Sequence, residues 1–526
     1  MDTKALRQKI LDLAIRGKLV PQDPNDEPAS VLLERIRAQK QQMVREGKLK
    51  SKDIKDDTVI FVGEDNLHYE KLPDGSVKCI EDEIPFDLPE SWAWCRIKNI
   101  CTIGTGATPL KSNSAYYANG TIPWITSAAT SQEIITTPAD YITERAIAET
   151  NCSIYPIGTL IIAMYGEGKT RGQISELGIE ACTNQACAAL QILADDVRLS
   201  QYVKSYFQYG YENLRQKAKG GQQPNLNQTI IAETLIAIPP YQETKRIMDS
   251  VYQCIDQINT IEEGIESICT SIENAKKRIL DLAIHGQLVP QNPADEPATV
   301  LLDRIRAEKE ELIRQGKIKR DKKESVIFRG DDNSYYEKVG AAVSCIDELI
   351  PFELPEGWAW VRGYSCFSGM ESKRPAGVDF DYIDIDSIDN RNHVTTEPKH
   401  MAVHDAPSRA SRAVRAGSVL FSLVRPYLQN IAYIPEEYSS CIASTGFYVC
   451  NSSGALIPEF MFYLMLSPYV VNGLNQFMKG DNSPSISKDD IENWLYPIPP
   501  IAEQKRIVIH VQKALEQTSL IASSLS

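Results

Sequence analysis

Apolar residues between Lys245 and Ile284 recur at alternating steps of four and three residues. This heptad pattern keeps one apolar stripe of a helix facing a partner helix. No proline lies between Pro240 and Pro290, and Gly264 is the only glycine inside the pattern. The stripe contains Val251, Cys254, Ile258, Ile261, Ile265, Ile268, Ile272, Ala275, Ile279 and Leu282. The pattern predicts one helix of roughly 40 residues, on the order of 60 Å long.

Four blocks of the first half of the chain recur, in the same order, in the second half. KILDLAIRGKLVPQ at 9–22 returns as RILDLAIHGQLVPQ at 278–291, and DEPASVLLERIRA at 26–38 returns as DEPATVLLDRIRA at 295–307. EIPFDLPESWAW at 83–94 corresponds to LIPFELPEGWAW at 349–360, and IPPYQETKRI at 238–247 corresponds to IPPIAEQKRI at 498–507. An internal repeat of this kind predicts one scaffold built twice.

The second copy of the scaffold stops about where the first copy begins, so the repeat is circular. The long helix should therefore exist twice, once intact and once divided between the two ends of the chain. The divided copy would use Leu6, Ile10 and Leu13 at one end and Ile507, Val511, Ala514, Thr518, Ile521 and Leu525 at the other. Antiparallel pairing with the intact helix would bury both parts. We predict a pseudo-twofold α+β molecule with a coiled coil of two long antiparallel helices through its middle.

Shorter patterns predict the elements of each scaffold copy and of the two dissimilar segments between them, residues 95–232 and 361–491, which we call the variable segments. Gly17 should end the first helix, and Ser30 should N-cap a helix that runs to Arg45. Strands are expected at 59–62, 69–72, 77–80, 159–165, 188–193, 418–424 and 447–450, and helices at 199–214 and 458–477. The variable segments echo one another in this order, so a shared fold is expected.

Composition limits the possible functions. The net charge of −14 weighs against a simple basic nucleic-acid binder. The 12 cysteines form no CxxC pair, as in a reduced cytosolic protein, and the six histidines never lie near paired cysteines, so no metal site is expected. No apolar run approaches the length of a membrane span, and no signal-peptide core is seen. We expect a cytoplasmic protein.

Two stretches imitate catalytic motifs without completing them. Gly166-Glu167-Gly168-Lys169-Thr170 follows a predicted strand, but a phosphate-binding loop needs glycine at Ala163 and a helix afterwards. Ile238-Pro239-Pro240-Tyr241 resembles the motif of amino-group DNA methyltransferases, yet isoleucine stands where an Asn or Asp side chain would bind the amino group. We interpret it as a rigid strand-to-helix turn, and we expect no catalytic site in this chain.

The ordered set of motifs resembles the specificity subunits of type I restriction-modification systems along essentially the whole chain. LRQKILDLAIRGKLVPQDPNDEPASVLLERIRAQK at 6–40 is similar to that family's conserved region, and the circular repeat matches its layout. GTGATP at 104–109, IPWITS at 122–127, TNQAC at 183–187 and QPNLN at 223–227 resemble parts of a target recognition domain. Tyr116-Tyr117 stands where many members have Tyr-Trp, and DYIDIDSID at 381–389 resembles a different subgroup.

The resemblance implies a DNA sequence-specificity subunit without catalysis of its own. Two mixed α/β target recognition domains would each read one half of a split target in double-stranded DNA, and the coiled coil would set the gap. Two modification subunits would methylate adenine with S-adenosylmethionine, and two restriction subunits would use ATP and Mg. No cofactor is expected on this chain. The implied division is 1–92 and 286–358 for the scaffold copies, 93–238 and 359–497 for the recognition domains, 239–285 for the central helix, and 498–526 for the C-terminal part of the divided helix.

Candidate DNA-reading residues are polar and basic residues in loops marked by glycine or proline. Arg and Lys suit guanine, Asn and Gln suit adenine, and both classes can hold phosphates. In the first domain they are Lys111, Ser112, Asn113, Lys169, Arg171, Gln222, Gln223 and Asn225. In the second they are Lys373, Arg374, Arg409, Arg412, Arg415, Arg425, Tyr427, Asn482 and Ser483. Trp124, Tyr116 and Tyr117 are expected in the core rather than stacked on bases. Arg409, Arg412 and Arg415, spaced by three, suit one helix face or an exposed loop.

Two other functions compete with DNA recognition. One is a structural coiled-coil scaffold that binds no nucleic acid, and the other is a nucleotide-dependent enzyme that uses Gly168-Lys169-Thr170. Residues 93–232 carry 11 Lys+Arg and 10 Asp+Glu, whereas residues 360–491 carry 11 and 14. The rest of the chain therefore holds most of the negative charge. DNA affinity from phosphate neutralisation should be modest for this chain alone, and partner subunits would supply the remainder.

Overall fold

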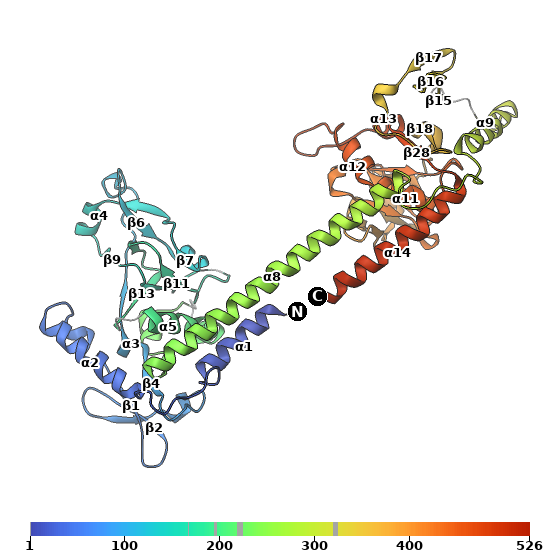
Figure 1. Ribbon diagram of the computed structural model, residues 1–526. Coiled ribbons are helices and arrows are strands. Elements are labelled where there is room, and N and C mark those ends of the chain that lie inside the picture. Colours follow the sequence, from blue (N-terminus) through green and yellow to red (C-terminus); the bar gives the residue numbers. More distant parts are fainter. Residues whose placement is uncertain (1, 167, 194–196, 218–224, 319–323, 526) are drawn as a thin grey trace. The chain divides into compact units, whose positions relative to one another are not determined.

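A computed structural model describes residues 2–166, 168–193, 197–217, 225–318 and 324–525 (Figure 1). The chain forms two compact units, Met1–Gly264 and Ile265–Ser526, which we call unit 1 and unit 2. The long helix α8 (Tyr241–Ile284) belongs to unit 1 up to Gly264 and to unit 2 beyond it. Helices and strands mix in both units, as the α+β prediction requires. No helix of the described ranges is long and apolar enough to span a lipid bilayer.

Unit 1 contains two groups of strands and several short helices. Its helices besides α8 are α1 (Thr3–Ile15), α2 (Ala29–Arg45), α3 (Ile97–Ile100), α4 (Glu144–Glu149), α5 (Val197–Tyr209), α6 (Tyr211–Lys217) and α7 (Gln228–Ala232). Its strands are β1 (Val59–Val62), β2 (His68–Lys71), β3 (Val77–Cys79), β4 (Ala93–Arg96), β5 (Cys101–Thr105), β6 (Ile122–Ile125), β7 (Ile134–Ile135), β8 (Asp140–Ile142), β9 (Ile154–Tyr155), β10 (Leu160–Ala163), β11 (Ile174–Leu177), β12 (Ala181–Thr183), β13 (Cys187–Ile192) and β14 (Leu235–Ile238).

Unit 2 contains a matching set of elements. Its helices besides α8 are α9 (Ala298–Arg314), α10 (Gly363–Cys366), α11 (Pro458–Leu466), α12 (Pro468–Asn475), α13 (Lys488–Asn493) and α14 (Ile501–Leu525). Its strands are β15 (Ser325–Arg329), β16 (Tyr335–Val339), β17 (Ala342–Cys345), β18 (Ala359–Arg362), β19 (Asp379–Ile383), β20 (Ile388–Asp389), β21 (Val394–Thr395), β22 (Lys399–Ala402), β23 (Ala410–Ala413), β24 (Val419–Ser422), β25 (Ile431–Tyr433), β26 (Ile442–Ser444), β27 (Phe447–Cys450) and β28 (Leu495–Ile498).

The two variable segments share most of their topology despite their different sequences: β13-β10-β11-β7 corresponds to β27-β24-β25-β21, whereas β5 and β20 are added at opposite ends. In unit 1 the sheets run β5-β13-β10-β11-β7 and β8-β6-β12-β9, and in unit 2 they run β20-β21-β25-β24-β27 and β22-β19-β26-β23. The parallel pair β6–β12 corresponds to β19–β26, and the antiparallel pair β10–β13 corresponds to β24–β27. The buried β10 and β24 lie within their sheets and form the core strands that the apolar runs predicted. The predicted shared fold is confirmed.

The scaffold of each unit repeats the same three parts. A three-stranded antiparallel sheet, β1-β2-β3 or β15-β16-β17, precedes a two-stranded pair, β4–β14 or β18–β28, at the root of the variable segment. The second strand of each pair ends at two prolines, which cannot donate to a ladder, and the next residues begin α8 or α14. The interpretation of Ile238-Pro239-Pro240 as a strand-to-helix turn is therefore confirmed.

A buried carboxylate ties the start of each long helix to its scaffold. Trp92 Nε1 donates to Glu243 Oε2 at 3.0 Å, and Gln22 Nε2 donates to Oε1 at 2.6 Å. In unit 2, Trp358 Nε1 and Gln291 Nε2 donate in the same way to Glu503, at 3.0 and 2.9 Å. Burial raises the pKa of both glutamates, and these hydrogen bonds act against that rise. The repeated blocks of the sequence therefore preserve one polar anchor.

The predicted continuous helix is confirmed, but its apolar stripe is only partly buried. Ile247, Val251 and Ile258 are buried in unit 1, and Ile272 is buried in unit 2. Ile261 and Ile268 are each 42% exposed, so this middle part of the stripe is not buried. In this part of unit 1 a polar contact replaces an apolar one, since Arg7 Nη2 donates to Asn259 Oδ1 at 2.7 Å and pairs with Glu262 at 2.8 Å.

The partners of α8 differ in their burial as well. Ile10 on α1 and Ile507 and Val511 on α14 are buried, whereas Leu6 and Ile521 are exposed. Ile507 and Val511 share an apolar cluster with Leu280 of α8, and Ile10 shares one with Ile258. Each half of the divided helix thus packs into the core of its own unit.

Some helix ends differ from the predictions. Gly17 follows α1 with φ +65°, as expected of a helix-ending glycine. Ser30 does not cap α2, because the helix begins one residue earlier, at Ala29, behind Pro28. The helix predicted at 199–214 is divided at Gly210 into α5 and α6. The one predicted at 458–477 is divided at Ser467, whose side chain caps α12 by accepting from the Val470 amide.

Candidate DNA interface

Four loop segments of unit 1 meet at one end of its variable segment. They are residues 106–113 after β5, 164–166 and 168–173 after β10, 184–186 after β12, and 225–227 before α7. The Met164 amide donates to the Ala186 carbonyl at 2.7 Å, and the Leu226 amide donates to the Met164 carbonyl at 3.1 Å. Gly106 lies so close to β12 that an added Cβ would be 1.6 Å from the Thr183 carbonyl oxygen. We call these four segments the unit 1 loop group.

Lys169 and Arg171, both predicted readers, lie in the segment after β10 and are held by α6. Tyr211 Oη donates to the Lys169 carbonyl at 2.5 Å, and Arg215 Nη1 donates to the Arg171 carbonyl at 3.2 Å. The Arg215 guanidinium also lies over the Tyr211 ring, 5.1 Å from its centroid, and donates to Tyr211 Oη at 2.6 Å. The Lys169 side chain is exposed. This loop therefore presents the exposed Lys169 cation, and its backbone is held in place by hydrogen bonds from Tyr211 and Arg215.

The other predicted readers of unit 1 have different positions in this group. Lys111 and Ser112 are exposed in the segment after β5, and Asn113 is half-buried because its side chain caps the next turn by accepting from the Ala115 amide at 3.2 Å. Asn225 is exposed beside Leu226. Gln222 and Gln223 lie outside the described residues. The structure thus places Lys169, Arg171 and Asn225 in the same loop group.

Unit 2 has an equivalent loop group after β24. The Leu423 amide donates to the Gly446 carbonyl at 2.8 Å, and the Ile486 amide donates to the Leu423 carbonyl at 2.9 Å. These two bonds repeat those made by Met164 and Leu226. The two loop groups therefore share a backbone frame although their side chains differ, which is the arrangement expected for two readers of different sequences.

Arg425, Tyr427, Asn482 and Ser483 come together in this second group. The Arg425 amide donates to the Pro484 carbonyl at 2.8 Å, and Arg425 Nη2 donates to the Asn482 carbonyl at 3.0 Å. Arg425 has φ 47° and ψ 57°, a left-handed conformation that is uncommon outside glycine and costs on the order of 1–3 kcal/mol. Tyr427, Asn482 and Ser483 are exposed. Such strain concentrates at binding loops.

Lys373, Arg374 and Arg409 line a neighbouring part of unit 2. Lys373 Nζ donates to the Ser440 carbonyl and Arg374 Nη1 to the Ser408 carbonyl, both at 3.2 Å. Arg409 pairs with Asp384 at 3.2 Å. An open hollow joins Arg409 to the loop after β24, and it is lined by Asp384, Ile385, Asp386, Ile388, Asn390, Arg409, Leu428 and Asn430. Carboxylates and amides in such a hollow can accept from cytosine or bind adenine.

The spacing of Arg409, Arg412 and Arg415 reflects neither a helix nor a simple loop. These residues lie on and beside β23, whose pairing with β26 shifts register between Ala410 and Arg412. Arg415 is turned toward its own unit, since its Nε donates to Asn451 Oδ1 at 3.1 Å and its Nη2 to the Ser452 carbonyl at 3.3 Å. A bulged strand explains the irregular facing of the three arginines.

The structure adds residues that sequence reasoning missed. Tyr211 and Arg215 stand four residues apart on α6, a spacing that places two side chains on one helix face. Gln185 is exposed in the turn after β12, where its Oε1 accepts from Thr108 Oγ1 at 2.7 Å. Asn390 Nδ2 donates to the Leu428 carbonyl at 2.8 Å. The sequence signal for Tyr211 and Arg215 was their i, i+4 spacing on a helix. Gln185 and Asn390 could not be found in this way, because they contact chain segments that meet only in the fold.

The aromatic residues expected in the core are there. Trp124 is buried with Cys152 and Cys182, and Tyr116 and Tyr117 pack against the same cluster. Trp124 Nε1 donates to the Ala107 carbonyl at 3.0 Å, and Tyr117 Oη donates to the Pro109 carbonyl at 2.7 Å. These contacts support the segment that carries Lys111. The segment that imitates a phosphate-binding loop is followed by strand β11, whereas a phosphate-binding loop leads into a helix.

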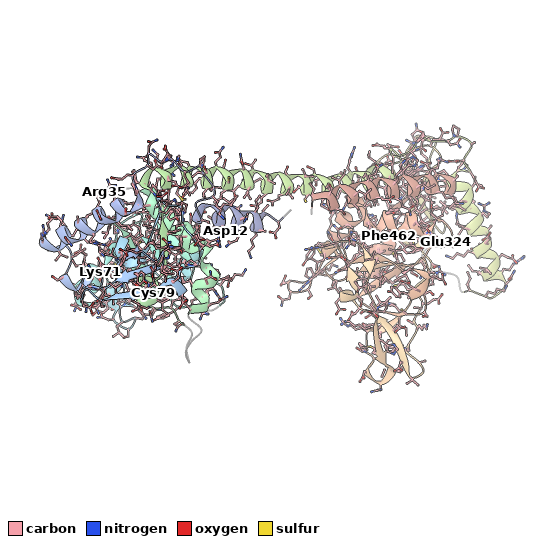
Figure 2. The ribbon with its side chains drawn as sticks, turned by 90° about the horizontal axis from the view of Figure 1, so that it is seen from below. Asp12, Arg35, Lys71, Cys79, Glu324 and Phe462 are labelled. Atoms are coloured by element: carbon pink, nitrogen blue, oxygen red, sulfur yellow. The ribbon has the colours of Figure 1, made fainter. Side chains whose placement is uncertain are left out.

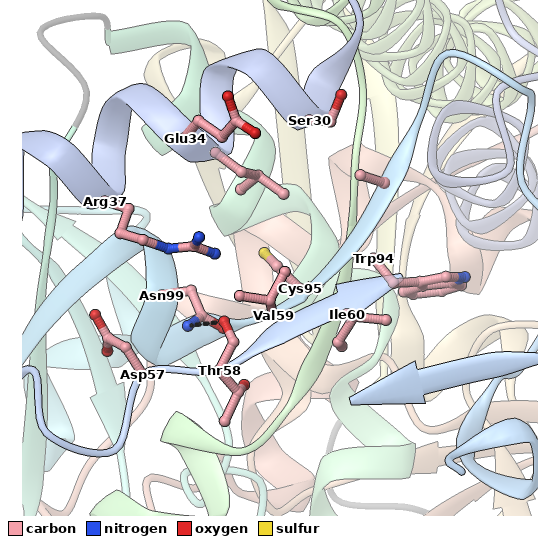
Figure 3. A pocket seen from close by; sticks show the side chains of 12 residues that line it. Ser30, Glu34, Arg37, Asp57, Thr58, Val59, Ile60, Trp94, Cys95 and Asn99 are labelled. Carbon is pink, nitrogen blue, oxygen red and sulfur yellow. Dashed lines mark hydrogen bonds between the residues drawn. The ribbon is translucent and has the colours of Figure 1, made fainter. Parts of the chain in front are cut away.

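A small pocket lies between α2 and β1 (Figure 3). Asn99 Nδ2 donates to the Thr58 carbonyl at 3.0 Å across its floor. Burial raises the pKa of the Cys95 thiol, which therefore stays protonated and unreactive. Burial also raises the pKa of Asp57, while Lys40 at 2.8 Å opposes that rise. The lining residues are thus engaged in packing and internal contacts, and Arg37 and Glu34 lie at the edge of the pocket.

No group of three or more His, Cys, Asp or Glu side chains in the described ranges is placed to hold a metal ion. His400, on strand β22, contacts Asp381 Oδ1 at 2.9 Å, and this hydrogen bond raises the pKa of the imidazole. What the two loop groups offer is exposed cations, amides and hydroxyls on fixed backbones. Such groups are typical of a protein that binds a polyanion or the edges of nucleic-acid bases.

Comparisons with known proteins agree with this class. Residues 89–268 match the family described as "Type I restriction modification DNA specificity domain". The specificity subunit of the type I restriction enzyme EcoAI from Escherichia coli is 26% identical over 586 residues, which cover 98% of this chain and 89% of the relative. The EcoEI specificity subunit from Escherichia coli is 26% identical over 433 residues, which cover 70% of this chain and 62% of the relative.

The fold agrees as well. A chain solved in a study of complex assembly and conformational transition of the type I R-M system covers 84% of this chain and 94% of its own length, with a TM-score of 0.50 and 16% identity. The protein described here is thus similar, along nearly its whole length, to the DNA specificity subunits of type I restriction-modification systems.

Proposed function

We propose that this subunit reads a bipartite target in double-stranded DNA, one half with each loop group. The observation that carries the proposal is the pair of variable segments, which share a core strand order but present different side chains at the same backbone positions. A common frame with different readers is what a split, asymmetric target requires. Lys169 and Arg171 would serve the first half, and Arg425, Tyr427 and Asn482 the second. The recognition domains would span 93–238 and 359–497.

The scaffold would hold the two readers apart and carry the rest of the enzyme. In this proposal α8 pairs with α1 and α14 as an antiparallel coiled coil within a circular, pseudo-twofold repeat, and its length sets the gap between the half-targets. Two modification subunits with S-adenosylmethionine and two restriction subunits with ATP and Mg dock on the cytoplasmic complex. This chain supplies specificity and no catalysis. The charge pattern supports the division, because the variable segments are far less acidic than the scaffold.

The test is adenine methylation across the genome, in cells with this chain and a cognate modification subunit and in cells lacking the chain. We expect a split motif that disappears with the chain. Exchanging residues 93–238 for those of another specificity subunit should change one half of the motif and leave the other half and the gap unchanged. An unchanged methylation pattern in cells lacking the chain would contradict the proposal and favour a scaffold without DNA recognition.

Lys169→Ala should weaken binding to all DNA sequences and reduce the dependence of affinity on salt. Each phosphate contact that is lost lowers the slope of log affinity against log salt by about 1. The measurement is fluorescence anisotropy of a labelled duplex between low and physiological salt, with the subunit in its modification complex. Lys48→Ala is the matched control, since Lys48 is an exposed scaffold lysine paired with Glu46. Equal salt slopes for the two variants would exclude Lys169 from the phosphate contacts.

A further inference from the structure

The small sheet β1-β2-β3 has an outward face that carries apolar and aromatic side chains. Phe61 lies directly opposite Tyr69, and Tyr69 opposite Cys79; in the next row Lys71 lies opposite Val77. Residues paired in this way share one face of a sheet. Phe61 is 41% exposed and Val77 53%, and Lys71 and Cys79, labelled in Figure 2, are exposed too. We call the five residues Phe61, Tyr69, Lys71, Val77 and Cys79 the outward face of unit 1.

The opposite face of the same sheet is fixed to the scaffold. Glu70, which points inward, accepts from Arg96 Nη2 at 2.7 Å and from Thr58 Oγ1 at 2.6 Å. Its side chain is buried together with that of Arg96. The outward rings are also held in place, because Tyr69 Oη donates to Asp65 Oδ2 at 2.7 Å. The sheet is therefore a rigid platform whose exposed side has no structural role in its own unit.

Unit 2 repeats this face without a single change of residue. Phe328, Tyr336, Lys338, Val343 and Cys345 occupy the equivalent positions of β15-β16-β17. The Phe61–Tyr69 rings are 5.9 Å apart at 26°, and the Phe328–Tyr336 rings are 6.0 Å apart at 24°. Phe328 is 41% exposed and Val343 54%. The two faces match in composition, geometry and exposure.

Positions around the face have diverged. Val62 corresponds to Arg329, Leu67 to Ser334 and Lys78, which is exposed on the opposite face, to Ser344, and the turn before Val77 differs in length from the turn before Val343. Exposed residues that do not bind anything are free to change, as these neighbours did. A pair of rigid, identical apolar faces amid changed surroundings is typical of a shared partner.

We propose that the outward faces of the two units are docking sites for two copies of one protein, the modification subunit. This inference rests on the proposed function and adds the surface that its partner uses. The partner should present an apolar patch with a carboxylate, because Lys71 and Lys338 lie within each face and make no ion pair among the residues that the structure describes. Because one chain carries two such faces, it should bind two copies of the modification subunit.

The anchoring of each sheet favours the modification subunit as the occupant. Arg96, which holds Glu70, also donates through Nη1 to the Glu233 carbonyl at 2.9 Å, at the end of the variable segment. Arg362 repeats this, pairing with Glu337 at 2.7 Å and donating to the Asn493 carbonyl at 2.7 Å. A protein bound to the outward face is thereby fixed relative to the DNA-reading part of the same unit. An enzyme that modifies a base within the recognised half-target needs that fixed placement.

The experiment is native mass spectrometry of the full chain with its modification subunit, on variants of one face, the other face and both. Phe61→Ser with Lys71→Glu should lower the stoichiometry from two modification subunits to one, and Phe328→Ser with Lys338→Glu should do the same. All four substitutions together should leave none bound, with affinity at each altered site at least about tenfold weaker. Val62→Ser with Arg329→Ser, which changes exposed neighbours on the opposite face, is the matched control and should keep two.

Retention of two modification subunits by the fourfold variant would overturn the inference. So would a doubled mass of the chain alone that disappears in the fourfold variant, because the faces would then bind a second copy of this chain. Binding of the variants to target DNA separates the two proposals. If the fourfold variant binds the target normally but not the modification subunit, both stand; if the unaltered chain gives no sequence-specific binding in any complex, the proposed function fails, whatever the stoichiometry.

Discussion

Gly106→Ala should abolish recognition of the half-target read by unit 1. An added Cβ would stand 1.6 Å from the Thr183 carbonyl oxygen and 2.7 Å from Thr183 Oγ1, distances that no backbone tolerates. The segment 106–113 must then move away from β12 and carry Lys111 and Ser112 with it. Because specific contacts depend on fixed geometry, we expect DNA affinity to fall at least about tenfold. The measurement is binding of a duplex that carries both half-targets, and of duplexes in which either half is scrambled.

Gly369→Ala is the matched control, since a Cβ at that position of unit 2 would meet nothing within 4 Å. It should bind all three duplexes as the unaltered chain does. In Gly106→Ala, scrambling the first half-target should have no further effect, whereas scrambling the second should still weaken binding. Full discrimination of both halves by Gly106→Ala would show that the segment after β5 does not take part in reading.

This close approach illustrates what the sequence could not predict. Gly106 and Thr183 belong to motifs that were noted separately, GTGATP and TNQAC, and nothing local indicates that they touch. The same holds for Met164, whose backbone joins Ala186 on one side and Leu226 on the other. Periodicity reports which face of a strand is apolar, but the order of strands in a sheet depends on long-range packing. The meeting of loops was therefore not predictable from sequence.

Elements with a strong local pattern were predicted well. The strand Val59–Val62 and the strand Phe447–Cys450 have the bounds that were expected, and α8 extends the heptad pattern by one turn toward the N-terminus. Pro468 shows why other bounds were missed: an apolar run continues through it, yet proline at the first turn starts a new helix capped by Ser467. The boundary between the two helices is therefore set by this cap and not by the spacing of the apolar residues.

The loop positions of Lys169, Arg425 and Asn482 were predictable because glycine or proline marks these loops, and their role as readers stays a prediction. Arg215 was missed because a charged residue on a helix is usually a solvated surface residue. The hydrogen bonds of Arg215 to Tyr211 and to the Arg171 carbonyl form only in the folded chain. Arg415 is in a different position. It was nominated for its charge and its spacing, but its guanidinium is bound to Asn451 and Ser452.

Arg96→Ala should destabilise unit 1 by about 3–5 kcal/mol, the usual cost of removing one partner from a buried ion pair. The substitution would leave Glu70 buried without its cation and would free Glu83, which Arg96 also holds at 2.9 Å. The Glu233 carbonyl would lose its donor at the root of the variable segment. The measurement is urea unfolding, with hydrogen exchange of the β2 and β4 amides to assign the loss to unit 1. Lys78→Ala is the control: Lys78 pairs with the same Glu83 at an exposed position, where removal costs less than about 1 kcal/mol.

Lowering the pH should reveal how much the Arg96–Glu70 ion pair contributes to stability. Burial alone would raise the pKa of Glu70, but hydrogen bonds from Arg96 and Thr58 lower it below the usual value. A carboxyl whose pKa is lowered by folding stabilises the fold above its unfolded pKa of about 4.3, and this contribution is lost as pH falls through the lower, folded pKa. The unaltered chain should therefore lose stability below that pH more steeply than Arg96→Ala, in which the pKa of Glu70 is no longer lowered. Parallel acid profiles for the two proteins, or a loss under 1 kcal/mol at neutral pH, would show that packing rather than this ion pair holds the sheet to the recognition domain.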